Sequence, residues 1–276
     1  TARQDGRVRA VMLNGSRANP NAPRDFFQDY DIVYFVTGLD SFLQDPHWID
    51  RFGERMILQL PDEMGDPPAG DGPGYAYLIQ FMDGNRIDMT LFPVARLDRL
   101  EEDSQTILLL DKDGLFEPFP PASDRGTLPK PPTARQFADC CNEFWWVSPY
   151  AAKGLWRREL PYAKDFQAGY IRSQLMKMLK WAVGVQSGFS ANPGKEGKYL
   201  EDCLPPAWWG LLVRTYSDGD YERTWEALLV MGQLFRLAAQ EVGQHFGYVY
   251  PQGDYDRVSA HLRHVRALPR DAMEMY

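Results

Sequence analysis

The chain has 276 residues with a formal net charge of −8, 44% hydrophobic and 25% charged residues, which is the composition of an ordinary soluble globular protein of one large or two smaller domains. An acidic chain is a poor candidate for a nucleic-acid-binding protein, because neutralising phosphates requires basic patches; it suits a cationic substrate better. The sequence shows no signal peptide and no apolar run long enough to cross a bilayer, and its three cysteines lack metal-site spacing. We therefore expect a cytoplasmic protein that binds neither nucleic acid nor membrane, and a monomer rather than an oligomer.

The first half of the chain has the sequence pattern of strands with short helices. Apolar or β-branched runs predict strands at residues 8–13, 30–37, 56–60, 75–81 and 86–92, with the last two forming a hairpin around Asp83-Gly84. Residues 61–74 are rich in Pro, Gly and Asp and predict a surface loop, and residues 97–103 predict a short helix.

A proline-rich stretch then separates this half from a helical one. Six prolines fall between residues 118 and 132, which predicts a domain boundary. Thr133 is a suitable N-cap for a helix that runs through Trp146, and near-helical spacing of apolar residues predicts helices at 166–184, 224–246 and 254–267. The expected fold is α+β, with a mixed-sheet domain at residues 1–125 and an all-helical domain at residues 133–276.

The chemistry is concentrated in residues 14–33. A strand leads into Gly15-Ser16, where glycine lets a phosphate approach the backbone and successive N–H groups with a hydroxyl can cradle an anion. Arg17 can add a charge-assisted hydrogen bond. Asp29 and Asp31 open the next strand two residues apart, so both point to one face and repel each other unless a cation lies between them. Oxygen ligands of this kind predict one or two Mg²⁺ ions.

A third acid, Asp88, lies in an alternating strand pattern where aspartate is rare. If this strand lies beside that of Asp31, Asp88 meets the metal pair and can accept a proton from an attacking hydroxyl. The plainer alternative is a strand-end acid paired with Arg86. Similarly, a D-x-D pair alone is often a solvated strand start.

Together these motifs resemble the nucleotidyltransferase superfamily: a Gly-Ser turn, a loop, an aspartate pair on a strand and a third carboxylate on a later strand. Longer strings resemble the aminoglycoside 6-adenylyltransferases that inactivate streptomycin. They are NGSR at 14–17, DFFQDYDIVY at 25–34, PDEM at 61–64, DGNRID at 83–88, CCNEFWWV at 140–147 and WEAL at 225–228.

The resemblance implies a polymerase-beta-like palm followed by a helical domain, with ATP and drug held between the domains. It implies Asp29 and Asp31 as metal ligands, Asp88 as general base beside the substrate, and phosphate contacts from Lys195, Lys198 and Tyr216. A solvated loop lysine is the alternative interpretation of Lys195.

The expected reaction moves AMP from ATP to a hydroxyl of streptomycin, at position 6 by resemblance alone, and so confers antibiotic resistance. Glu143 and Asp165 are the candidate carboxylates for the drug's guanidinium groups, although either can be a surface or capping acid. The alternatives are the same chemistry on another antibiotic or on a protein hydroxyl, a tRNA-directed nucleotidyltransferase, and a non-catalytic nucleotide-binding module.

Overall fold

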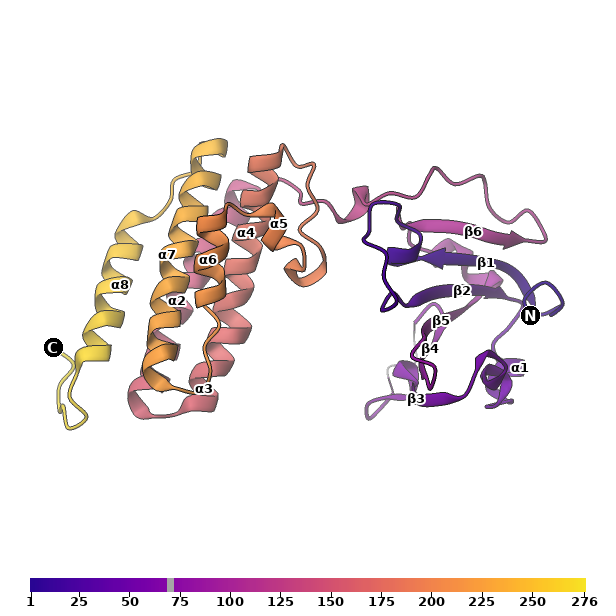
Figure 1. Cartoon of the computed structure of the whole chain (residues 1–276), viewed down its shortest axis with the longest axis horizontal. Helices are drawn as coiled ribbons and strands as arrows, with labels where there is room; N and C mark the ends of the chain where they lie inside the picture. The colour runs from indigo at the N-terminus through magenta and orange to yellow at the C-terminus, as the bar shows by residue number, and fades with distance from the viewer. Residues whose placement is uncertain (69–71) are drawn as a thin grey trace. The chain divides into compact units, whose positions relative to one another are not determined.

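The computed structural model describes residues 1–68 and 72–276, and the chain divides into two compact units, Thr1–Gly126 and Thr127–Tyr276 (Figure 1). The first unit is a mixed sheet with short helical turns, and the second is helical. This arrangement confirms the predicted α+β class. The division falls within the proline-rich residues 118–132.

Within the described residues, one sheet contains six strands in the order β3-β4-β5-β2-β1-β6. The strands are β1 (Val8–Asn14), β2 (Tyr30–Val36), β3 (Arg55–Gln59), β4 (Tyr75–Phe81), β5 (Arg86–Pro93) and β6 (Thr106–Asp111). β2 and β5 run parallel, whereas the other neighbouring strands are antiparallel. Because β2 and β5 are paired and parallel, residues at their starts lie side by side.

Apolar residues cover both faces of the sheet. On one face, α1 (Asp40–Leu43) and the turn η2 (Trp48–Phe52) supply Phe42 and Trp48, which pack with Ile79 and Tyr77. On the other face, Phe35 packs with Phe92, and the turn η4 (Val94–Arg99) contributes Leu97. The sheet is therefore a rigid base on which side chains at the strand ends are held in register.

Two sequence-based expectations for this unit were incomplete or wrong. β6 was not predicted. It is an edge strand, and its Ile107 and Leu109 side chains are accordingly 39% and 50% exposed. The helix expected at 97–103 is only the turn η4, because Asp103 accepts a hydrogen bond from the Gln105 backbone at 2.8 Å, and such local bonds compete with helix.

The predicted loop at 61–74 begins with the turn η3 (Pro61–Glu63), and its residues 69–71 lie outside the described residues. Both acids of η3 fasten it to the start of β4. Asp62 accepts a hydrogen bond from the Ala76 backbone at 2.7 Å, and Glu63 accepts one from the Tyr75 hydroxyl. The PDEM string at 61–64 therefore has a structural role at the edge of the sheet.

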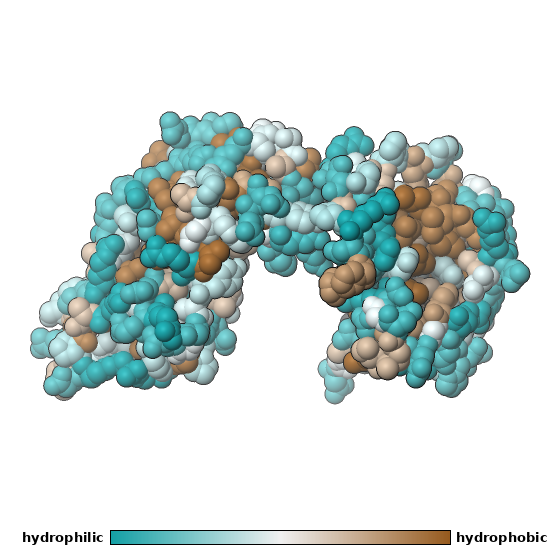
Figure 2. Space-filling view, viewed as in Figure 1, coloured by the Kyte–Doolittle hydropathy of each residue, from teal (hydrophilic) through white to brown (hydrophobic). Residues whose placement is uncertain are grey.

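The second unit is built from helices, with α4 packed on α7 and α2 packed on α8. The helices are α2 (Ala134–Arg157), α3 (Leu160–Asp165), the π-helical turn η6 (Phe166–Ile171), α4 (Arg172–Ser187), the turn η7 (Lys195–Gly197), α5 (Leu200–Cys203), α6 (Pro206–Arg214), α7 (Tyr221–Phe246) and α8 (Gln252–Ala267). On the face shown in Figure 2, hydrophilic side chains cover most of this unit, and hydrophobic ones gather on the sheet unit. None of the helices in residues 1–68 and 72–276 is both long and apolar enough to cross a membrane.

The helical predictions were correct in kind but not always in extent. Thr133 caps α2 as predicted, with a reciprocal pair of hydrogen bonds to Gln136, yet α2 continues past Trp146 and through Pro149 to Arg157. Its buried face goes on through Leu155, and this packing outweighs the helix-breaking tendency of one proline. The expected helix at 166–184 begins as the π-helical turn η6, whose wider turns bury Gln167, and continues as α4 to Ser187. The helices α3, α5 and α6 were not predicted.

The core of the helical unit predicts a large effect of one substitution. Phe144 is fully buried and stacks on Phe235 with ring centroids 3.9 Å apart. We expect Phe144→Ala to lower the free energy of unfolding by about 3–5 kcal/mol, measured by circular dichroism during urea unfolding. Trp146 on the same helix is 66% exposed, and Trp146→Ala should change the free energy of unfolding by about 0.5 kcal/mol or less. Equal effects of the two substitutions would contradict this assignment of the core.

Candidate active site

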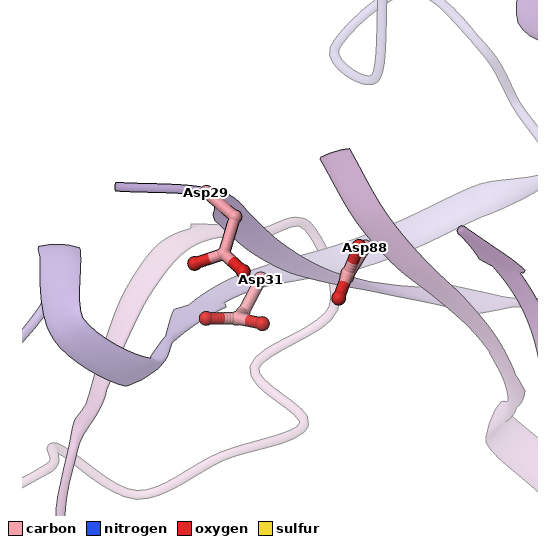
Figure 3. A group of neighbouring side chains, drawn as sticks. All are labelled: Asp29, Asp31 and Asp88. Atoms are coloured by element: carbon pink, nitrogen blue, oxygen red, sulfur yellow. The ribbon is translucent and has the colours of Figure 1, made fainter. Parts of the chain in front are cut away.

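Three carboxylates meet at the N-terminal ends of the two central strands, β2 and β5. Asp31 on β2 pairs with Asp88 on β5 in the parallel register, so both side chains leave the same face, and Asp29 directly precedes β2 (Figure 3). Each residue places one carboxylate oxygen within 4.8 Å of the others. The structure thus brings together the three acids that the sequence singled out. We call Asp29, Asp31 and Asp88 the acidic triad.

Gly15 lies against this triad for a steric reason. Its φ is +72°, a left-handed conformation that favours glycine. A Cβ atom added at Gly15 would lie 2.1 Å from the Oδ2 atom of Asp31. The absence of a side chain therefore leaves room for the Asp31 carboxylate. This steric role is separate from the predicted approach of a phosphate to the Gly15 backbone.

The turn η1 (Gly15–Arg17) is tied to the start of β2 by two side chains. The Arg17 guanidinium donates to the carbonyl oxygens of Gln28 at 2.7 Å and Asp29 at 3.0 Å, and it stacks on the Tyr30 ring at 3.7 Å. In return, the Gln28 side-chain amide donates to the Ser16 carbonyl at 3.1 Å. Arg17 therefore closes the loop that carries Asp29, a role that sequence reasoning missed; its phosphate contact stays a prediction.

Arg86 completes the charge arrangement. Its Nε and Nη2 atoms donate to the two carboxylate oxygens of Asp88 at 2.7 and 2.6 Å, and its Nε lies 3.9 Å from Asp29 Oδ2. These hydrogen bonds to Asp88 raise the pKa of Arg86, and the charges of Asp29 and Asp31 add to the effect. The pairing of Asp88 with Arg86, the plainer alternative from the sequence, is present together with the triad and does not replace it.

A cavity of about 940 Å³ opens on the same face of the sheet. Asn14, which pairs with Asp31 in the register of β1 and β2, forms part of its wall. Apolar side chains including Met12, Val33 and Phe116 line it, and its rim carries the acidic residues 101–103. These rim acids were not singled out in the sequence, because an exposed run of acids has no distinctive spacing.

The site residues predicted in the helical unit fall into separate groups. Lys195 and Lys198 are exposed on and beside η7, which directly precedes α5, whereas Asp165 ends α3, and Figure 1 places α3 and α5 at opposite ends of this unit. Tyr216 belongs with the α3 end, because Lys164 Nζ donates to the carbonyl of the adjacent Ser217 at 2.8 Å.

Tyr216 and Glu143 have their own surroundings within the helical unit. The guanidinium of the half-buried Arg172 stacks on the exposed Tyr216 ring at 3.8 Å and donates to the Thr215 carbonyl at 2.8 Å. Glu143 is half-buried in the middle of α2. The roles of these residues in binding phosphate or substrate stay predictions.

The Gly15 contact yields a sharp test of the triad. We expect Gly15→Ala to displace the Asp31 carboxylate and to weaken Mn²⁺ binding at least tenfold, measured by electron paramagnetic resonance. Gly84 is the matched control: it also has a positive φ of +88°, but nothing lies within 4 Å of the position that a Cβ atom would take there, so Gly84→Ala brings backbone strain without a clash. Equal Mn²⁺ affinities of the two variants would show that Gly15 does not shape the metal site.

The chain is similar to known proteins along most of its length. The sequence profile of the family described as Streptomycin adenylyltransferase matches residues 1–265. The chain is 40% identical to an aminoglycoside 6-adenylyltransferase of Bacillus subtilis (strain 168), over 92% of this chain and 90% of that protein, and 41% identical to one of Campylobacter jejuni, over 92% and 88%. A crystal structure of an aminoglycoside 6-adenyltransferase from Bacillus subtilis also matches, with 34% sequence identity and a TM-score of 0.49. The match covers 97% of this chain and 95% of the chain in that structure. By the family profile and the sequence identity to these relatives, the chain belongs to the streptomycin adenylyltransferase family.

Proposed function

We propose that this protein transfers AMP from Mg-ATP to a hydroxyl of streptomycin, at position 6, and thereby confers resistance to the drug. The observation that carries the proposal is the acidic triad, held by the parallel β2–β5 register directly beside the Gly15–Ser16 turn. Carboxylates and an anion cradle on adjacent elements are the two parts that a nucleoside triphosphate with its cation requires.

The residues present fit a magnesium ion. The triad offers only hard oxygen donors, three of them within 4.8 Å of one another, which is the donor chemistry that Mg²⁺ prefers. Asp29 and Asp31 would hold the ion. When bound, it would neutralise charge on the phosphate oxygens and acidify the attacking hydroxyl.

The chain's own residues would position the reactants and move one proton. The drug's hydroxyl oxygen forms a bond to the α-phosphorus of ATP, the bond from that phosphorus to the pyrophosphate oxygen breaks, and the hydroxyl proton passes to Asp88. The Gly15 and Ser16 backbone groups and the Ser16 hydroxyl would bind phosphate oxygens. Lys195 would neutralise the leaving pyrophosphate, with Lys198, Tyr216 and Arg17 as further phosphate contacts.

A cationic acceptor is supported by the charge of the protein. The net charge of −8 favours the approach of a cation over that of a nucleic acid. Guanidinium groups of the drug would be bound by carboxylates, with Glu143 and Asp165 as the candidates in the helical unit. The acidic rim of the cavity at residues 101–103 adds negative charge on the catalytic face.

The decisive experiment is pyrophosphate release from Mg-ATP with streptomycin, spectinomycin, kanamycin or no drug. We expect release with streptomycin only, and a decrease of roughly 100- to 1000-fold in kcat for Asp31→Asn, because a charge that organises the reacting phosphate is lost. Asp50→Asn is the matched control, since Asp50 pairs with Arg55 in an ion pair of 2.7 Å elsewhere on the sheet unit.

Each other result selects a different function. Release with another drug would keep the chemistry and change the acceptor. ATP binding without release under any condition would favour a nucleotide-binding module. Retention of full activity by Asp31→Asn would remove the triad from the mechanism.

The lysines of η7 allow a separate test. We expect Lys195→Ala to raise KM for ATP or lower kcat by roughly tenfold or more, because one charge-assisted phosphate contact is lost. Lys177→Ala on α4 is the control, as Lys177 is also an exposed lysine of the helical unit. Unchanged kinetics of Lys195→Ala, measured by steady-state pyrophosphate release, would leave Lys195 as a solvated loop residue.

A further inference from the structure

Arg86 lies where the acidic triad needs a positive charge. Two of its nitrogen atoms each donate to one oxygen of Asp88, and its Nε lies 3.9 Å from Asp29. Arg86 is on β5 two residues before Asp88, so strand alternation directs both side chains to the same face. The pair therefore forms within one strand.

Arg86 contacts both Asp88, the proposed proton acceptor, and Asp29, one of the two proposed metal ligands. Both oxygens of Asp88 accept hydrogen bonds from the guanidinium, and Asp29 faces it. A guanidinium does not lose its proton in proteins, so its charge can leave the triad only by movement of the side chain. That movement is feasible because the Arg86 side chain is 46% exposed and long enough to extend into solvent.

We propose that Arg86 is the resident counter-cation of the acidic triad, and that a divalent cation displaces it from Asp29 and Asp88. This inference rests on the proposed function in taking the triad as the metal site. In the metal-free chain, Arg86 lowers the mutual repulsion of the three carboxylates. It therefore weakens the binding of a free metal ion.

The exchange has a consequence for selectivity. A free metal ion must displace the guanidinium into water, whereas a metal–nucleotide complex brings phosphate oxygens to which the displaced guanidinium can bind. Arg86 therefore disfavours free metal more than it disfavours the metal–nucleotide complex. This preference would keep the triad from binding metal before the nucleotide arrives.

The test is a Mn²⁺ titration of the full chain that is monitored by electron paramagnetic resonance. It is carried out with and without α,β-methylene-ATP, an analogue that cannot release pyrophosphate. Removing one positive charge a few ångströms from a divalent ion is expected to tighten Mn²⁺ binding roughly tenfold in Arg86→Ala without nucleotide. With the analogue, the gain should shrink or reverse. Arg86→Lys keeps the charge and should stay near the wild type.

Arg55→Ala is the matched control, because Arg55 also pairs with an aspartate, Asp50, at 2.7 Å on the sheet unit but lies outside the triad. It should leave the Mn²⁺ affinity unchanged, and thermal unfolding checks that each variant is folded. Unchanged or weaker Mn²⁺ binding by Arg86→Ala, or no Mn²⁺ binding by any variant, would overturn the proposal. Pyrophosphate release, assayed separately, decides the proposed function: tighter Mn²⁺ binding without release would contradict that function and keep this inference.

Discussion

The parallel pairing of β2 with β5 is the constraint on which the site depends. It sets Asp31 opposite Asp88 and brings three carboxylates within 4.8 Å, an arrangement that is unfavourable by itself because like charges repel. The sheet can impose it because both of its faces are covered by apolar clusters. The core of the first unit thus supplies the stability that offsets a local repulsion, a pattern common at functional sites.

Two neighbours make this repulsion tolerable, by different means. Gly15 has no Cβ and so leaves the space that the Asp31 carboxylate occupies, while Arg86 contributes a positive charge to Asp88 and, at longer range, to Asp29. One contribution is steric and the other is electrostatic. Gly15 directly follows β1, the strand paired with β2, and Arg86 lies on the strand of Asp88.

Arg17 shows how a residue in a chemical motif can have a structural task. Its guanidinium hydrogen-bonds to two carbonyl oxygens at the end of the loop and stacks on Tyr30, so it fixes where Asp29 enters the site. The acids of the PDEM string act similarly at the edge of the sheet. Matching strings of a family therefore mix residues that bind reactants with residues that hold the site together, and contacts separate the two.

Local signals in the sequence were enough to predict the α+β class, most of the strands and long helices, the three members of the triad and the family. The hydrophobic period, the turn residues and the D-x-D spacing that carry these predictions each extend over only a short stretch of the chain. They missed β6, although Thr106–Asp111 contains an apolar and β-branched run, and the four shorter helices α1, α3, α5 and α6. They ended α2 too early because the packing of its buried face outweighs the helix-breaking tendency of Pro149. The folded chain was needed to establish that Asp88 both joins the triad and pairs with Arg86, and that Gly15 makes room for Asp31. Strand register and a side-chain clash depend on residues distant in the chain, and no local pattern encodes them.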